Sequence, residues 1–274
     1  MRTIATYLNL IAAIILVFAP TMASGQMLIH RRKAFRTPVY APYAASFNGS
    51  TQMMRMSTQP TGVAADGNAF TISFWINLAG GDTTLQTIFS IGDGTVQRLG
   101  ILRTTGGKFQ ARGFSFGASE RLTVVSSVNL LAADTGFDGS DGWTHVYLSV
   151  NLGSGSNGKL YFNGVEDTSA TWSNYSGASS IDLLPATPRW TIGADQSTAA
   201  TNRLNGALSE LVFFNTYSDN PTGYYSGTAP ISPPAGMDLY FSTTGSGDNW
   251  ATDNSGNGNN FTVTASPLGS PSGP

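Results

Sequence analysis

The sequence has 274 residues, of which 41% are hydrophobic, so it is long enough for one large domain with a buried core. Charged residues make up only 11%, against about 25% in an average protein, and 32 glycines favour turn-rich β-structure over helix. A formal net charge of −2 gives no basis for a nucleic-acid partner, and the lack of cysteine excludes disulfides and thiolate zinc sites.

The N-terminal residues follow the order of a secretory signal peptide. An apolar run over residues 10–19 (LIAAIILVFA) is followed by small residues at 23–25 (ASG), directly before Gln26. We expect residues 1–25 to be a signal peptide, which makes the protein secreted, or else a hydrophobic N-terminal extension. The run is too short for a stable membrane span in the mature form.

Two further segments are expected to lie outside the folded domain. Residues 26–44 carry a basic cluster at 30–36 and show neither the helical nor the strand period, so they predict a basic arm. The arm is either solvated or docks to an anionic partner or a neighbouring subunit. Residues 267–274 have little apolar surface to bury and predict a flexible tail.

From residue 45 onward, short strand patterns recur at intervals of roughly ten residues, separated by Gly, Asn and Asp turns. Strands or hairpins are expected at 70–78, 84–92, 99–114, 121–130, 142–150, 159–166, 189–195, 204–215, 237–243 and 261–266. No long segment after residue 45 has a 3.6-residue period, so helix content should be low. Many short strands with regular turns predict a β-sandwich or barrel.

Local signals refine these expectations. Asn163-Gly164 between apolar residues predicts a tight hairpin, and Gly106-Gly107 is expected to supply the two positive φ angles of another. The segment 142–150 (GWTHVYLSV) alternates as a half-buried strand does. It places His145 on the second face, where packing across to a neighbouring strand is the expected role.

An ordered series of motifs resembles the laminin-G-like, concanavalin A-like jelly-roll domain over residues 45–216. The motifs are ASFNGSTQ (45–52), FTISFWI (70–76), TIFSIGDG (87–94), GWTHVYLSV (142–150), LYFNGV (160–165), WTIGAD (190–195) and LNGALSELVFFN (204–215). The resemblance implies an all-β fold, a jelly-roll sandwich of two antiparallel sheets packed face to face. Residues 237–265 either complete the sheet beside the 45–52 strand, so that the domain spans 45–266, or begin a second module.

The carboxylates argue against an enzyme. Hydrolases that share this sandwich carry an E-x-D-x-x-E motif on one strand, but the chain has only Glu120, Glu166 and Glu210, none with that spacing. A structural hydrogen-bonding role is expected for Glu210. His145 has no second histidine or cysteine nearby for zinc, and no G-x-S-x-G motif is present. We expect no catalytic residues.

Calcium is the cofactor that the resemblance implies, because relatives bind it at the rim of the sandwich through oxygen ligands. Asp93 (in IGDG) and Asp195 (in IGAD) follow strands beside glycine and are the expected ligands. The alternative is the oxygen-rich turn of Asp253, Asn254 and Asn257. Aspartates at such positions also serve simply as turn residues.

Aromatic side chains outside the apolar faces of the strands are candidates for binding sugar rings. Trp172 and Tyr175 lie in the loop TWSNYSG, and Trp75 lies between Ser73 and Asn77. Trp250 is a further candidate. Burial is the alternative for Trp75 and Trp250.

Two functions are therefore expected. The first is a non-catalytic carbohydrate-binding or adhesion module, displayed outside the cell or on a particle surface, with a glycan or cell-surface polysaccharide as partner. The alternative is a bacteriophage virion structural protein, a capsid decoration or tail component that contacts other virion proteins, because phage proteins with such domains show a similar arrangement.

Overall fold

The computed structural model describes residues 44–64, 66–79, 84–130, 142–153, 157–174, 180–224, 236–241, 248–265 and 268. The predicted signal peptide or extension (1–25), the basic arm (26–44) except for its last residue, and Tyr175 lie outside the described residues. The helices within these ranges are two 3-10 turns, η1 (Pro221–Gly223) and η2 (Asp248–Ala251), and neither is long and apolar enough to cross a membrane.

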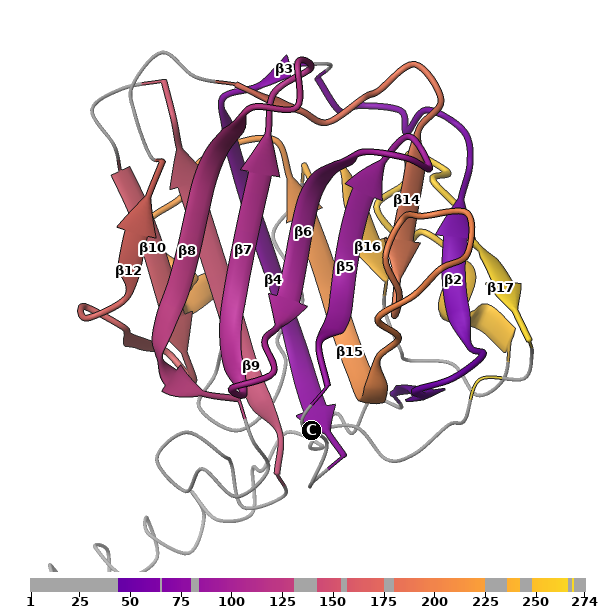
Figure 1. The fold of residues 1–274 in the computed structure, drawn as a ribbon, viewed down its shortest axis with the longest axis horizontal. Coiled ribbons are helices and arrows are strands. Elements are labelled where there is room, and N and C mark those ends of the chain that lie inside the picture. Colours follow the sequence, from indigo (N-terminus) through magenta and orange to yellow (C-terminus); the bar gives the residue numbers. More distant parts are fainter. Residues whose placement is uncertain are drawn as a thin grey trace, which may run out of the picture. The chain divides into compact units, whose positions relative to one another are not determined.

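The described strands form two large antiparallel sheets, which confirms the predicted two-sheet sandwich. Figure 1 looks onto the eight-stranded sheet, with β4, β9 and β15 of the other sheet behind it. The seven-stranded sheet has the order β1 (Ala45–Asn48), β15 (Asn205–Phe214), β4 (Ala69–Leu78), β9 (Thr144–Asn151), β10 (Asn157–Phe162) and β11 (Val165–Glu166), with β16 (Leu239–Phe241) also paired to β15. The eight-stranded sheet has the order β12 (Thr171–Ser173), β8 (Glu120–Asn129), β7 (Lys108–Phe114), β6 (Gln97–Arg103), β5 (Gln86–Gly92), β14 (Arg189–Ile192), β2 (Met53–Met56) and β17 (Thr262–Thr264). A small ribbon pairs β13 (Ile181–Asp182) with β3 (Asp66–Gly67).

The core lies between the two large sheets and follows the alternation in the sequence. Ile72, Phe74 and Ile76 of β4 face it from one side, and Leu99 and Ile101 of β6 face it from the other. All five are buried. Each such side chain contributes roughly 1.5–3 kcal/mol by leaving water, so the strand pattern and the core have the same physical cause.

The half-buried pattern predicted for 142–150 is wrong for the second face of β9. His145 and Tyr147 are fully buried as well. The chain after β15 covers this face: the Tyr147 ring lies 5.3 Å from the Tyr224 ring, and the Tyr147 hydroxyl donates to the Ser218 carbonyl at 2.7 Å. A central strand covered on both faces buries its polar side chains too, and these then need hydrogen-bond partners.

One of the two predicted turns is confirmed and the other differs. Asn163 and Gly164 have φ of 49° and 76°, as a tight hairpin requires, and they join β10 to β11. In the β6–β7 hairpin only Gly107 has a positive φ, of 80°. There the Gly107 N–H donates to the Thr104 carbonyl, so the turn is longer than two residues and Gly106 needs no positive φ.

The segment after residue 236 contributes one strand to each large sheet. β16 pairs with Leu211–Phe213 of β15, on the edge that β1 occupies further along the same strand. β17 pairs with Met53–Arg55 of β2 and forms the edge of the eight-stranded sheet. The C-terminal segment is therefore paired with β2, near the start of the domain, in one sheet and with β15 in the other.

A buried aspartate closes the turn between these two strands. The Asp253 carboxylate accepts hydrogen bonds from the backbone N–H groups of Tyr240 at 3.0 Å and Asn259 at 2.8 Å.

The expected flexible tail (267–274) contains a buried residue. Leu268 packs into the core cluster, and it is the one residue of that tail that the structure describes. Its apolar side chain was the signal that the segment had something to bury.

Candidate functional site

Polar side chains cross the outer face of three neighbouring strands at one edge of the eight-stranded sheet. The register pairs Thr191 of β14 with Arg55 of β2, and Arg55 with Thr262 of β17. Met54 and Met56, on either side of Arg55, are buried in the core. Because side chains alternate along a strand, Arg55 points outward, away from that core.

A second polar row lies two residues further along the same strands. Continuing the register places Ser57 between Arg189, at the start of β14, and Asn260, just before β17. We call the side chains of Arg55, Ser57, Arg189, Asn260 and Thr262 the Arg55 face. It combines hydroxyl, amide and guanidinium groups, which are the groups that hydrogen-bond to sugars.

Two grooves open on the Arg55 face, one on each side of β2, and they share Arg55 and Ser57. The first has a volume of about 450 Å³, and its lining includes Arg55, Ser57, Thr187, Pro188, Arg189 and Thr198. The second has a volume of about 470 Å³, and its lining includes Arg55, Ser57, Thr58, Asn260, Thr262 and Thr264. Both volumes fall in the range of small-ligand sites.

Arg55 is held in place by the loop that follows β14. Its Nη2 donates to the carbonyls of Asp195 at 3.3 Å and Ser197 at 3.0 Å, and its Nε donates to Thr191 Oγ1 at 3.2 Å. Arg189 Nη1 in turn donates to Thr198 Oγ1 at 3.0 Å. The same loop therefore positions both guanidinium groups of the grooves.

The electrostatics of the Arg55 face are dominated by positive charge. Burial lowers the pKa of Arg55, and the nearby charges of Arg189 and Arg203 lower it further, while Asp195 acts in the opposite direction. The guanidinium is nevertheless protonated at neutral pH, because the usual pKa of arginine lies far above neutrality. The positive charges of these arginines therefore repel one another. The one neighbouring carboxylate, that of Asp195, offsets this repulsion only in part.

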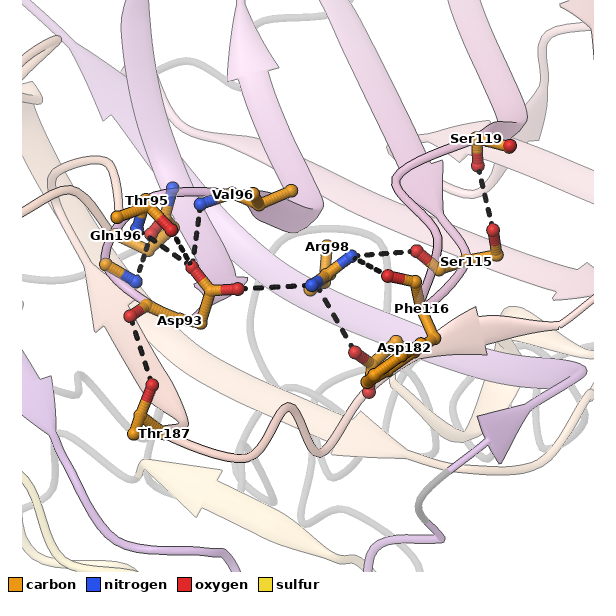
Figure 2. Close-up of polar contacts among 11 residues, drawn as sticks. Asp93, Thr95, Val96, Arg98, Ser115, Phe116, Ser119, Asp182, Thr187 and Gln196 are labelled. Carbon is orange, nitrogen blue, oxygen red and sulfur yellow. Dashed lines mark hydrogen bonds and ion pairs between the residues drawn. The ribbon is translucent and has the colours of Figure 1, made fainter.

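The predicted calcium ligand Asp93 lies in a hydrogen-bonded turn (Figure 2). One carboxylate oxygen accepts the N–H of Val96 at 2.7 Å and both the N–H and the hydroxyl of Thr95, at 2.9 and 2.7 Å. The other lies 3.1 Å from Nη2 of Arg98. Partial burial acts to raise the pKa of Asp93, but these hydrogen bonds and the charge of Arg98 lower it to about 2.

Arg98 connects Asp93 to a second, more deeply buried aspartate. Its Nε lies 3.3 Å from Asp182 Oδ2, and its Nη1 donates to the carbonyls of Ser115 at 2.9 Å and Phe116 at 2.7 Å (Figure 2). Burial raises the pKa of Asp182, whereas the charge of Arg98 opposes that effect. The arrangement ties the β5–β6 turn to the β7–β8 hairpin and to β13.

The second predicted calcium ligand, Asp195, also closes a turn. Its carboxylate accepts from the backbone N–H groups of Ser197 at 3.1 Å and Thr201 at 2.9 Å, and from both of their hydroxyls. Across the described ranges, no three His, Cys, Asp or Glu side chains group closely enough to hold a metal ion. Calcium binding at Asp93 or Asp195 stays a prediction.

The three predicted tryptophan sites lie further inside the fold than an open sugar-stacking surface would. Trp75 is 3% exposed and packs with Trp143 on the outer face of the seven-stranded sheet, and Trp250 is buried in the core. Burial, the alternative for both, is what the structure shows. Trp172 is half-buried, with its ring so close to Gly158 that a side chain there would collide with it. Glycan contact by Trp172 stays a prediction.

The three glutamates lie on different strands, each with its own contact. Glu120 is paired with Arg112 and Glu166 with Lys159, both at 2.7 Å. Glu210 is buried at the β-bulge of β15, has a φ of 50°, and accepts a short hydrogen bond from the Tyr240 hydroxyl. That bond agrees with the structural role expected of Glu210.

His145 is a buried packing residue. Its ring lies 5.2 Å from that of Trp75, its register partner on β4, and its Nε2 lies 2.8 Å from the Ser73 hydroxyl. Burial lowers the pKa of His145 from 6.5 to about 3. The histidine is therefore neutral at physiological pH, which confirms the expected cross-strand packing role.

No residue of the Arg55 face was among the site residues predicted from the sequence. The signal was present locally, because MMRMS (53–57) and FTVT (261–264) each alternate and so place Arg55 and Thr262 on an outer face. What the pattern could not give is that β2 lies between β14 and β17, because Arg55 is 136 residues from Thr191 in the sequence and further still from Thr262.

The architecture is that of a two-sheet jelly-roll sandwich with a polar, cationic groove pair on one outer face. Residues 48–219 match the family model of the Concanavalin A-like lectin/glucanases superfamily. The match covers more than half of the chain, so the chain belongs to this superfamily, as the motif series suggested. No curated protein sequence matches the chain.

A solved structure shows the same fold. A Bacteroides ovatus protein proposed to bind carbohydrate superposes with a TM-score of 0.57 at 17% identity, over 85% of this chain and 61% of that protein. The chain thus spans about three fifths of the length of that relative. The heptameric SAP-like pentraxin of Limulus polyphemus gives a TM-score of 0.49 at 15% identity, over 85% and 94% of the two chains. At 17% identity, the likeness to the Bacteroides ovatus protein establishes the fold alone.

Proposed function

We propose that the protein is a non-catalytic carbohydrate-binding module that takes its glycan on the Arg55 face. The observation that carries the proposal is the pair of adjoining polar grooves on a concanavalin A-like sandwich. The Bacteroides ovatus protein, which is itself proposed to bind carbohydrate, supports the same class of ligand. Two grooves that share Arg55 and Ser57 suit an oligosaccharide, with one sugar unit on each side of β2.

The non-catalytic part of the proposal rests on the carboxylates. A glycosidase needs an acid and a second carboxylate about 5–10 Å apart, on either side of the scissile bond. The glutamates are engaged on separate strands, with Arg112, Lys159 and the Tyr240 hydroxyl. The linings of the two grooves contain no carboxylate among the described residues.

Ser57→Trp is expected to abolish glycan binding without unfolding the protein. Ser57 is exposed and lines both grooves, so an indole at this position fills the space where sugar units would lie. We expect the affinity for the best ligand on a glycan array to fall by at least about tenfold. Calorimetric titration measures the loss, and circular dichroism checks that the fold is retained.

The matched control is Val165→Trp, which adds the same indole at an exposed position on β11, in the other sheet. Its binding should equal that of the wild type. If Ser57→Trp also binds normally, the glycan site lies elsewhere on the sandwich. If the wild-type protein binds no glycan on the array, the proposed function is wrong.

We also propose that the module acts outside the cell, on the basis of the apolar run at 10–19 and the small residues before Gln26. Mass spectrometry of the protein isolated from its producing cells is expected to give an N-terminus at Gln26. A chain that retains Met1 contradicts export, and recovery of such a chain in purified phage particles favours the virion role instead.

A further inference from the structure

Three arginines lie around the first groove, and the carboxylate of Asp195 offsets their charge only in part. Arg55 and Arg189 line it, and Arg203 is close enough for its charge to act on Arg55. Ion pairs within the described part of the chain involve other residues, and none of these three takes part in one. Their described hydrogen bonds go to neutral carbonyl and hydroxyl oxygens, as at Thr51, whose carbonyl accepts from Arg203 at 2.8 Å.

This local excess of positive charge contrasts with the rest of the molecule. The formal net charge is −2, so the cations on the Arg55 face are not part of a generally basic surface. Grouping like charges costs free energy, and their repulsion is part of what lowers the pKa of Arg55. A bound anion would relieve that repulsion, and a groove concentrates the field that attracts it.

The linings of the two grooves also lack a feature of many sugar sites. No aromatic ring is among the described residues that line them. Stacking on a sugar face therefore cannot supply the binding free energy there, which leaves hydrogen bonds and charge. Hydrogen bonds to charged groups are roughly twice as strong as neutral ones.

We propose that the Arg55 face recognises an acidic carbohydrate, a sugar chain that bears carboxylate or sulfate groups. The inference rests on the proposed function and adds the class of ligand. The guanidinium groups of Arg55 and Arg189 bind the anionic group in the first groove, because a guanidinium presents a planar fork that fits a carboxylate or sulfate. The hydroxyl and amide groups around Ser57, Asn260 and Thr262 bind the hydroxyls of the next sugar unit in the second groove.

Nucleic acid presents anions too, but the grooves fit it less well. Single strands are held by aromatic rings on which bases stack, and the described groove linings contain none. A duplex needs a broad basic surface, whereas the overall charge is negative. A single-stranded oligonucleotide is therefore included among the probes of the test.

The test measures binding of the full-length protein to four probes by calorimetry. The probes are trigalacturonate for the carboxylate, a heparin tetrasaccharide for the sulfate, galactotriose as the neutral counterpart of trigalacturonate, and a 15-residue oligothymidylate. We expect at least one acidic sugar to bind at least about tenfold more tightly than galactotriose. Raising the salt concentration from 50 to 500 mM should weaken that binding.

Arg189→Gln is the decisive variant, because Arg189 lines the groove while its described hydrogen bond goes only to Thr198. We expect it to weaken acidic-sugar binding by about tenfold to hundredfold and to weaken galactotriose binding by a smaller factor. Arg121→Gln is the matched control: it removes the same charge from β8 of the same sheet, outside both grooves. Thermal melting of both variants checks their folding.

The outcomes separate the two proposals. Equal binding of galactotriose and the acidic sugars, or an Arg189→Gln effect no larger than that of Arg121→Gln, overturns the acidic-ligand inference and leaves a neutral-sugar module. Tighter binding of oligothymidylate than of any sugar overturns it in favour of nucleic acid. Binding to none of these probes overturns the inference, and a blank glycan array in addition overturns the proposed function itself.

Discussion

Replacing Arg98 with methionine is expected to lower the free energy of unfolding by about 3–5 kcal/mol, because it leaves the buried Asp182 without its cation. The change also removes the donors to the carbonyls of Ser115 and Phe116. Asp93 loses the same partner, but three hydrogen bonds from its own turn remain. Urea denaturation at pH 7 measures the effect.

Arg112→Met is the control for this experiment. Arg112 pairs with Glu120 at 2.7 Å, but its side chain is 39% exposed, so we expect a loss below about 1 kcal/mol. Adding Asp182→Asn to Arg98→Met should restore part of the stability, since the buried charge is then gone. Equal effects of Arg98→Met and Arg112→Met would show that the Arg98 ion pairs do not hold the β5–β6 turn.

The protein is expected to lose stability in mild acid because of His145. Its pKa is about 3 in the folded protein and near 6.5 when unfolded, so the unfolded chain binds the proton first. For a group whose folded pKa is lowered in this way, stability is complete above pH 6.5 and falls as the pH drops toward 3. Proton linkage gives a loss of about 2 kcal/mol between pH 7 and pH 5.

His145→Gln removes this titration and keeps a polar group that can reach Ser73. The variant is expected to be less stable overall, but its free energy of unfolding should change little between pH 7 and pH 5. The difference in slope is therefore the readout, measured by urea denaturation at several pH values. Asp93 adds its own acid sensitivity only nearer pH 4 and below, because its pKa is lowered to about 2. Parallel slopes for the two proteins would contradict the assignment to His145.

Much of the fold could be predicted because strand patterns are local. The alternation at 70–78 places Ile72, Phe74 and Ile76 in the core, and Asn163-Gly164 forms the hairpin turn that its sequence favours. The second faces could not be predicted in this way. Trp75 and His145 are polar-side residues by alternation, yet both are buried. Whether an outer face meets solvent depends on which distant segment crosses it.

The sequence by itself determined the all-β class, the superfamily and the lack of a hydrolase motif, because each depends on patterns that are local or that keep their order along the chain. Only the tertiary structure brought Arg55, Arg189 and Thr262 onto one face. These residues come from three segments whose adjacency is set by strand pairing across the whole domain. The physical reason is that backbone hydrogen bonds between strands are alike for every sequence, so alternation fixes which way a side chain points but not which strand lies beside it.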